Sequence, residues 1–186
     1  MPETTDEEIA IAVKNGGVQA FGLLVERYEK KLLRYAGKFL IEHEDAKDIV
    51  QEVFIKSYKS IQSFDQDRKF SSWIYRIAHN EFINSIRKKG REPLSIFDPD
   101  TLIPHIAAPE KADDELKAKE MKEMVQQSLS ELDPKYREPL VLYYYEDMDY
   151  KAISEIMHIP VSTVGIRIKR AKDNLQKAYN KLHPKI

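Results

Sequence analysis

The sequence predicts an all-α protein with two small helical domains joined by a proline-containing linker, the second domain carrying a helix-turn-helix. Two observations support this fold class. Apolar residues recur at helical spacing in both halves of the chain, and between the halves the periodicity is lost where prolines accumulate. A composition that is 42% hydrophobic and 33% charged is typical of a soluble globular chain with long, surface-charged helices. We expect domains at 1–92 and 113–186, with the linker at 93–112.

Three helices are predicted before residue 61. The first spans 5–14 and ends at Asn15, Gly16 and Gly17, which is typical of a helix C-terminus. The second covers 21–39 and the third 44–60. In the third helix, apolar residues form a core stripe. Four acidic or amide side chains are expected on the opposite, exposed side: Asp45, Asp48, Gln51 and Glu52.

A fourth helix is predicted in FSSWIYRIAHNEFINSIRKK, residues 70–89, with Ser71 or Ser72 as its N-cap. One side is apolar. The other carries amides and cations, which suit unpaired base edges and phosphates: Arg76, Asn80, Asn84, Arg87 and Lys88. Four nearby rings could stack with unpaired bases: Phe64, Phe70, Trp73 and Tyr75. The alternative is an ordinary amphipathic helix with core aromatics and a solvated basic end.

The segment from Gly90 to about Ala112 is predicted to be a linker. It contains Pro93, Pro99, Pro104 and Pro109 and shows no sustained period. It also holds apolar residues, among them Phe97 and Ile103, that would be unfavourable in free solvent. We therefore expect this tether to dock on the chain's own domains or on a partner.

The second half contains a helix-turn-helix pattern. Asp133 and Pro134 are expected to start a helix that Pro139 kinks or restarts. A short helix follows in YKAISEIMHI, and Pro160 ends it. The next helix is expected to begin at Ser162-Thr163. The last helix is strongly basic outside its apolar seam, and its first residues are expected to face base edges in the major groove. A basic C-terminal helix that is merely solvated is the alternative.

Composition argues against several other classes. The chain has no cysteine, so it has no disulfide or thiol nucleophile, and its five histidines lack the spacing of metal ligands. No Gly-rich phosphate loop or nucleophile elbow occurs. We expect no cofactor, no metal and no catalysis. The acidic N-terminus and the lack of a long apolar run predict a soluble cytoplasmic protein. A net charge of −1 means that any DNA binding uses local patches.

These motifs together resemble the extracytoplasmic-function sigma factors, the small promoter-recognition subunits of bacterial RNA polymerase. DAKDIVQEVFIKSY (45–58) and FSSWIYRIAHN (70–80) are similar to sigma region two. LDPKYREPLVLYYYEDMDYKAISEIMHIPVSTVGIRIKRAKDNL (132–175) is similar to region four. The resemblance covers nearly the whole chain, and it implies a role in transcription initiation with core RNA polymerase, promoter DNA and an anti-sigma factor as partners.

The resemblance also implies residue roles. The residues that would dock the polymerase clamp helices are Asp45, Asp48, Gln51 and Glu52. Those that would capture the opened minus-ten element are Phe64, Arg68, Phe70, Trp73, Tyr75, Arg76, Asn80, Asn84, Arg87 and Lys88. Those that would read the minus-thirty-five duplex are Ser162, Thr163, Gly165, Ile166, Arg167, Lys169 and Arg170.

The chain departs from the family pattern at a few positions. Asn84 stands where Asp is common, and Gly165 and Ile166 stand where a cation followed by Ser or Thr is frequent. Two other classes share some of these features: a stand-alone helix-turn-helix regulator with a helical sensor domain, and a helical interaction protein that titrates regulators. The first would need a ligand pocket in the N-terminal half, and the second would not need the basic helix.

Overall fold

The computed structural model describes residues 4–39, 43–88 and 112–184, and all regular structure in these ranges is helical. The prediction of an all-α chain is confirmed for this part. The elements are α1 (Asp6–Lys14), the 3₁₀ turn Val18–Ala20, α2 (Phe21–Phe39), α3 (His43–Ser60), the 3₁₀ turn Ile61–Ser63, α4 (Phe70–Lys88), α5 (Ala112–Ser130), α6 (Pro134–Tyr145), α7 (Tyr150–Met157) and α8 (Val161–Leu182). The linker predicted at 93–112, with its proposed docking residues, lies almost entirely outside the described residues.

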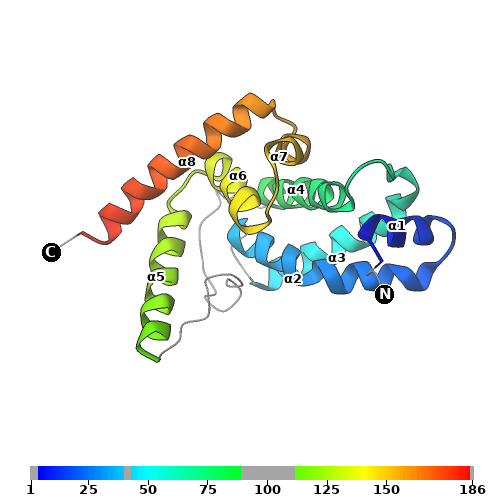
Figure 1. The fold of residues 1–186 in the computed structure, drawn as a ribbon, viewed down its shortest axis with the longest axis horizontal. Helices are drawn as coiled ribbons and strands as arrows, with labels where there is room; N and C mark the ends of the chain where they lie inside the picture. The colour runs from blue at the N-terminus through cyan, green and yellow to red at the C-terminus, as the bar shows by residue number, and fades with distance from the viewer. Residues whose placement is uncertain (1–3, 40–42, 89–111, 185–186) are drawn as a thin grey trace.

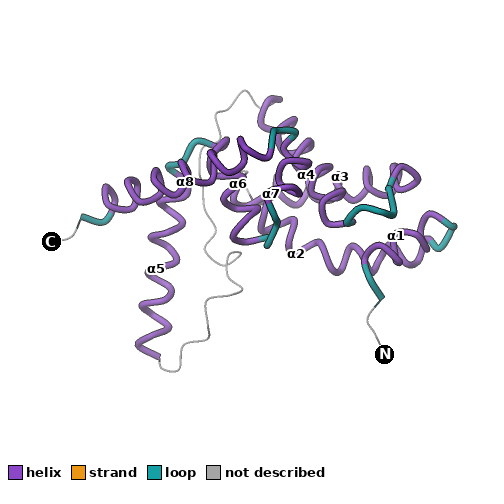
Figure 2. Tube along the Cα trace, turned by 45° about the horizontal axis from the view of Figure 1, so that its top comes forward, coloured by secondary structure: helices purple, strands orange, loops and turns teal. Residues whose placement is uncertain are grey.

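Helices α1 to α4 form an N-terminal bundle, and α5 to α8 form a C-terminal bundle (Figure 1). The two bundles touch where α6 and α7 lie against α2 and α4, as both views show (Figures 1 and 2). Helices α5 and α8 extend away from this contact. The contact places the helix-turn-helix beside the amide and basic helix α4.

The N-terminal bundle is held by an apolar core that the helical periodicity predicted. Leu24, Leu32 and Tyr35 of α2 are buried, as are Val50 and Val53 of α3. From α4, the core receives Phe70, Trp73, Ile74, Tyr75, Ala78 and Phe82. Burying a large apolar side chain stabilises a fold by about 1.5–3 kcal/mol, so these contacts fix how α4 lies on α2 and α3.

Helix α1 has the boundaries that its sequence predicts. Thr5 and Glu8 form a capping box, with Thr5 Oγ1 accepting from the Glu8 amide and Glu8 Oε2 accepting from the Thr5 amide. At the other end, Asn15 caps the helix and Gly16 takes a φ of 97°, which glycine adopts without strain.

The start of α4 differs from the prediction. The helix begins at Phe70 rather than after a serine cap, and Glu7 of α1 supplies the cap, because its Oε1 accepts from the Phe70 amide at 2.8 Å. A carboxylate at this end is favoured by the helix dipole as well as by the hydrogen bond. The prediction that Ser71 or Ser72 is the N-cap is therefore wrong.

Helix α6 begins as predicted and continues further than expected. Asp133 accepts from the Lys135 amide and Pro134 occupies the first turn. Pro139 does not restart the helix, which runs unbroken to Tyr145. The ring of Pro139 is buried beside Leu140 and Val141, and this packing offsets the backbone hydrogen bond that proline removes.

The turn between α7 and α8 has the helix-turn-helix form that the sequence predicts. Asp149 caps α7, and His158 closes it in the left-handed conformation with φ 53°. Pro160 is the N-cap of α8, so the helix starts at Val161, one residue before the predicted Ser162. Val164, Ile168 and Ala171 bury the seam of α8 against the bundle, which leaves its other faces to solvent.

Candidate nucleic-acid interface

Helix α3 presents the acidic and amide face that the sequence predicts. Asp48, Gln51 and Glu52 are exposed, whereas Val50 and Val53 on the other side are buried. Glu52 Oε1 lies 3.8 Å from Lys56 Nζ one turn later. An exposed ion pair of this kind contributes little to the stability of the fold. The side chain of Asp45 lies outside the described residues. The exposed face is available for a partner without any change in the core.

Three of the aromatics expected to stack with bases are buried against one another. Phe64, Phe70 and Trp73 form a triangle with 5.5 Å between each pair of ring centroids, and each ring is at most 6% exposed. Their apolar area is removed from water, which stabilises the bundle. In this structure the rings form core, as in the alternative interpretation, and they offer no stacking surface to bases.

The aromatic triangle instead supports the loop between Phe64 and Lys69. The Phe64 carbonyl accepts from Lys14 Nζ at 2.8 Å, and Gln62 Nε2 donates to the Lys14 carbonyl. These bonds tie the start of the loop to the end of α1. The loop's own polar groups, including Arg68, remain exposed.

The polar side of α4 lies as predicted. Asn80, Asn84, Arg87 and Lys88 are exposed, and Arg76 is half-buried. Tyr75 differs from them, because it is buried and its hydroxyl donates to Glu146 of the C-terminal bundle. Burial, together with that carboxylate, raises the pKa of Tyr75. Four cationic or amide side chains thus line one side of α4 in solvent.

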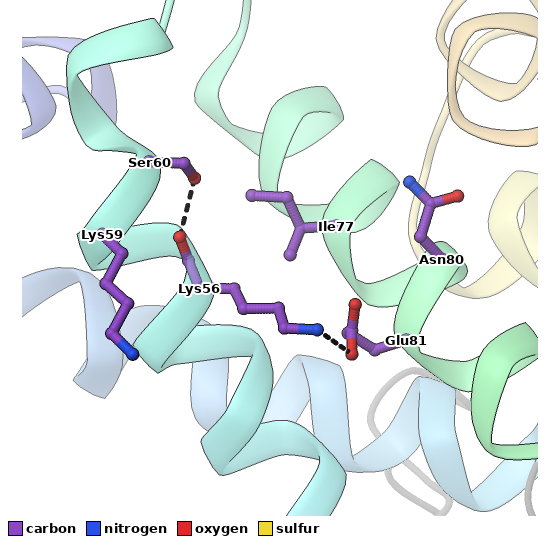
Figure 3. A pocket seen from close by; sticks show the side chains of 6 residues that line it. All are labelled: Lys56, Lys59, Ser60, Ile77, Asn80 and Glu81. Carbon is purple, nitrogen blue, oxygen red and sulfur yellow. Dashed lines mark hydrogen bonds and ion pairs between the residues drawn. The ribbon is translucent and has the colours of Figure 1, made fainter.

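A groove of about 410 Å³ runs between α3 and α4 beside these residues (Figure 3). Its lining combines two cations, a carboxylate, a hydroxyl, an amide and apolar surface: Lys56, Lys59, Ser60, Ile77, Asn80 and Glu81. Lys56 is held by Glu81 at 2.6 Å, and the Ser60 hydroxyl donates to the Lys56 carbonyl. Lys59 also lines the groove from α3 and is exposed. The groove can contact both a phosphate and a base edge.

The start of α8 has the exposure that a helix entering a DNA groove requires. Ser162, Lys169 and Arg170 are exposed, Ile166 is 53% exposed, and Thr163, Gly165 and Arg167 are half-buried. A Cβ placed on Gly165 would lie 3.4 Å from the ring of Tyr150, an ordinary contact. Glycine is therefore not required there by packing, and it lowers helix propensity by roughly 1 kcal/mol.

Other kinds of site are not found in the described ranges. None of the described helices is long and apolar enough to cross a bilayer. Residues 4–39, 43–88 and 112–184 also contain no cluster of three or more His, Cys, Asp or Glu side chains that could hold a metal ion.

Comparisons with known proteins agree with this arrangement. The Sigma-70 region 2 family model matches residues 24–92, and the Sigma-70, region 4 model matches residues 122–175. The chain is 37% identical over 176 residues to the ECF RNA polymerase sigma factor SigW of Bacillus subtilis (strain 168), covering 89% of this chain and 91% of that protein. This chain belongs to the ECF sigma factors of RNA polymerase.

Solved structures of related proteins share the sigma factor's fold. CnrH, solved in complex with the cytosolic domain of CnrY, superposes with a TM-score of 0.71 at 25% identity, over 96% of this chain and 99% of that one. The sigma factor RpoE, solved with the anti-sigma factor NepR from Bartonella quintana, gives a TM-score of 0.66 at 23% identity, over 85% and 95% of the two chains. At 23% identity, the similarity to RpoE shows a shared fold alone.

Sequence reasoning missed part of this sigma factor's surface. Lys56, Lys59 and Ser60 of α3 were not among the predicted nucleic-acid residues, yet they line one groove with Asn80. The basic end of the third helix was a usable signal, because Lys56 and Lys59 are cations three residues apart on one helix. Their nearness to Asn80 depends on how α3 packs on α4, which the local sequence does not encode.

Proposed function

We propose that this sigma factor directs core RNA polymerase to promoters through three surfaces on its two bundles. Helix α3 docks the polymerase, the α3–α4 groove with the adjoining loop captures the opened minus-ten strand, and the start of α8 reads the minus-thirty-five duplex. The observation that carries the proposal is the N-terminal bundle, which exposes an acidic face on α3 and an amide and basic face on α4. A ligand sensor has no need of that pairing.

The polymerase-docking surface is proposed to consist of Asp45, Asp48, Gln51 and Glu52. The last three are exposed while the rest of their turn is packed, so they are free to meet a basic or amide-rich coiled coil. Charge complementarity of this kind steers association and sets orientation. Ile55 and Tyr58, each more than a third exposed, flank the acidic face and offer apolar area to the same partner.

The minus-ten strand is proposed to follow the polar side of α4. Arg76, Asn80, Asn84, Arg87 and Lys88 provide phosphate and base-edge contacts, and the groove adds Lys56, Lys59 and Ser60. Arg68 belongs to this set through the loop, whereas Phe64, Phe70 and Trp73 act by holding the loop and helix in place. Unstacking a base costs a few kcal/mol, which such contacts recover in the complex, so no nucleotide hydrolysis is needed.

The duplex reader is proposed to be the first turns of α8. Ser162, Thr163, Gly165, Ile166, Arg167, Lys169 and Arg170 lie on or near its exposed side. Ile166 can contact a thymine methyl group, and the cations can neutralise phosphates. The nearby Lys172 ammonium lies 5.1 Å from the centroid of the Tyr144 ring, within the range of a cation–π contact.

The remaining expectations belong to the same proposal. The chain acts in the cytoplasm, where its polymerase is found, without catalysis of its own and without a cofactor or metal. Its functional units are proposed to be 1–92 and 113–186, joined by 93–112, and the family-model matches at 24–92 and 122–175, one within each unit, support this division. An anti-sigma factor is proposed as a further partner, since RpoE, one structural neighbour, was solved bound to one.

Run-off transcription tests the proposed function. Purified bacterial core polymerase, alone and with this protein, is compared on a pooled genomic promoter library, and transcription start sites are mapped. We expect new starts that share two upstream motifs. Binding to duplex DNA with no core binding and no new starts would instead indicate a stand-alone helix-turn-helix regulator.

A further inference from the structure

Two carboxylates are buried in the contact between the two bundles, whose apolar residues form one core cluster. They are Glu138 of α6 and Glu146, which caps the end of that helix. The side chains of Glu138 and Glu146 are only 3% and 2% exposed, respectively. Ionised carboxylates are rarely buried unless paired, because removing a charge from water is costly. Arg34, Tyr35, Tyr75 and His79, which contact the two carboxylates, all belong to the N-terminal bundle. The cost of burying the carboxylates is therefore offset only while the bundles remain in contact.

Glu146 is held from two helices. Arg34 of α2 donates through Nε at 2.9 Å and through Nη2 at 2.8 Å, one to each carboxylate oxygen. Tyr75 of α4 donates its hydroxyl to Oε2. A bidentate guanidinium contact of this kind is strong and directional. Glu146 therefore fixes the end of α6 at the junction of α2 and α4.

Glu138 repeats this arrangement two turns earlier on α6. The Tyr35 hydroxyl donates to its Oε1 at 2.5 Å, and His79 Nδ1 lies 2.5 Å from the same oxygen. Tyr35 comes from α2 and His79 from α4. Each carboxylate thus joins one α2 side chain and one α4 side chain, so the pair fixes both position and rotation of α6.

Two further contacts surround the carboxylates. Arg137 Nη1 donates to the Lys38 carbonyl at 3.3 Å, while Nη2 donates to the Ser130 and Leu132 carbonyls of its own bundle. Arg68, in the loop before α4, lies 3.5 Å from Glu155 of α7. The Arg68–Glu155 ion pair is largely exposed, so it contributes little to the stability of the contact in water. It nevertheless places α7 over the loop that the proposed function assigns to strand capture.

The buried charges make the contact easier to open than a purely apolar one. Apolar residues of both bundles share one core, but the charges can be solvated again once the bundles separate. Replacing a buried ion pair by apolar residues often leaves stability unchanged or improves it, but removing one partner is strongly destabilising. The two carboxylates thus specify one closed geometry and still allow it to open.

The closed geometry covers only part of the proposed working surface. Tyr75 and His79 of α4 are held by α6, and Arg68 is engaged by α7. Asp48, Gln51 and Glu52 of α3 remain exposed, as do Ser162, Lys169 and Arg170 of α8. Asn80, Asn84, Arg87 and Lys88 of α4 are exposed too. Closure is therefore compatible with polymerase docking through α3, and it obstructs the strand only at the loop that holds Arg68.

We propose that Glu138 and Glu146 form an intramolecular latch that holds the C-terminal bundle against α4 and over the Arg68 loop, so that the minus-ten strand reaches this loop only after the latch opens. This inference rests on the proposed function of α4. It assigns these two carboxylates, with Arg34, Tyr35 and His79, to self-inhibition. Apparent affinity for the strand is then reduced by the fraction of molecules that are closed.

A distance measurement tests the latch directly. The chain has no cysteine, so Glu29→Cys on α2 and Lys177→Cys on α8, both exposed, give one spin label on each bundle. We expect a single, short distribution of distances between the two labels when the chain carries no other substitution. Glu138→Gln/Glu146→Gln should broaden and lengthen it, and Arg34→Gln, which breaks the same pair from the other bundle, should do likewise. Glu131→Gln, an exposed carboxylate beside α6, is the matched control.

Strand binding supplies the second readout. With a fluorescent random-sequence single-stranded 20-mer as the probe, both latch variants should bind at least about fivefold tighter than wild type, if the closed form is populated about tenfold over the open form. Affinity for the promoter's minus-thirty-five duplex should stay unchanged. Circular dichroism confirms that each variant keeps its helical content.

The outcomes separate the latch from the proposed function. Unchanged distances in both folded latch variants would overturn the latch, and so would lengthened distances with equal strand affinity. If the distances lengthen as expected but no form binds the single strand, then the bundles do latch and the assignment of α4 to the strand is wrong.

Discussion

Glu7 of α1 accepts a hydrogen bond from the backbone amide of Phe70, the first residue of α4, at 2.8 Å. The two residues are 63 positions apart, so the helix proposed to bind the DNA strand is capped by a side chain from another helix. This bond links the position of α1 to the start of α4 and to the loop before it.

Glu7→Ala should therefore lower the free energy of unfolding by about 1 kcal/mol, the usual cost of losing an N-cap. Ser71→Ala and Ser72→Ala should each change it by less than about 0.5 kcal/mol, because neither serine caps the helix in the structure. Urea denaturation followed by circular dichroism measures all three. A larger loss from either serine variant than from Glu7→Ala would contradict the assignment of the cap.

Asp48→Arg should weaken binding to core polymerase by about tenfold, roughly 1.4 kcal/mol, without loss of folding. Its carboxylate is exposed and forms part of the acidic face of α3, so reversal of its charge opposes the complementarity proposed there. Fluorescence anisotropy with labelled protein and purified core measures the change. Glu29→Arg, an exposed acid on α2, is the matched charge reversal and should bind normally. If Asp48→Arg unfolds the bundle while folded molecules bind core normally, the docking assignment is wrong.

Lys59→Glu should weaken binding of single-stranded promoter DNA several-fold while leaving duplex binding unchanged. Lys59 is exposed and lines the groove on the α3 side (Figure 3), and the substitution replaces a phosphate-attracting cation with an anion. Lys30→Glu, an exposed lysine on α2, carries the same charge change away from the groove. Equal effects of the two variants would show that only net charge is sensed and that the groove has no specific role.

Arg170→Ala should weaken binding to the minus-thirty-five duplex and reduce the slope of log affinity against log salt by about 1. The guanidinium is exposed on α8, where it is expected to contact a phosphate rather than a base. The loss should then be similar on matched and mismatched duplexes. A loss confined to one sequence, with an unchanged salt slope, would instead assign Arg170 to base reading.

Much of the fold was predictable because helix periodicity and caps are local signals. The stripes of α2, α3 and α4, the Asp133–Pro134 start of α6 and the turn before α8 all follow from residues close together in sequence. The role of Phe64, Phe70 and Trp73 was not settled by residue type, since the same rings suit a core or a stacking surface. Only packing distinguishes the two roles.

The contact between the bundles had no local signal at all. Glu146 belongs to a short acidic segment, EDMD, that the sequence indicates only as a connection between helices. Its partner Arg34 lies 112 residues earlier. Glu138 and His79 likewise lie on two separate helices, 59 positions apart. Pairing them requires knowledge of how α6 docks on α2 and α4, which depends on long-range packing.

Three buried tyrosines should make the folded protein less stable in alkaline solution. Burial, and next the neighbouring carboxylates, raise the pKa of Tyr28 beside Asp6, of Tyr35 beside Glu138 and of Tyr75 beside Glu146. Above the ordinary tyrosine pKa of ~10, the unfolded chain releases protons that the folded chain keeps. The unfolded state then binds fewer protons than the native state, so the free energy of unfolding falls as pH rises. Below that pH the contribution is fully present.

Urea denaturation at several pH values between ~8 and ~11 checks this dependence. Tyr35→Phe removes one ionisable hydroxyl and should make the alkaline fall in the free energy of unfolding shallower, although its baseline stability also drops because Glu138 loses a donor. Tyr58→Phe changes an exposed ring and should keep the wild-type slope. If both variants show the wild-type slope, the hydroxyl of Tyr35 is not protected from ionisation in the folded state, and the closed contact around Glu138 is not maintained in solution.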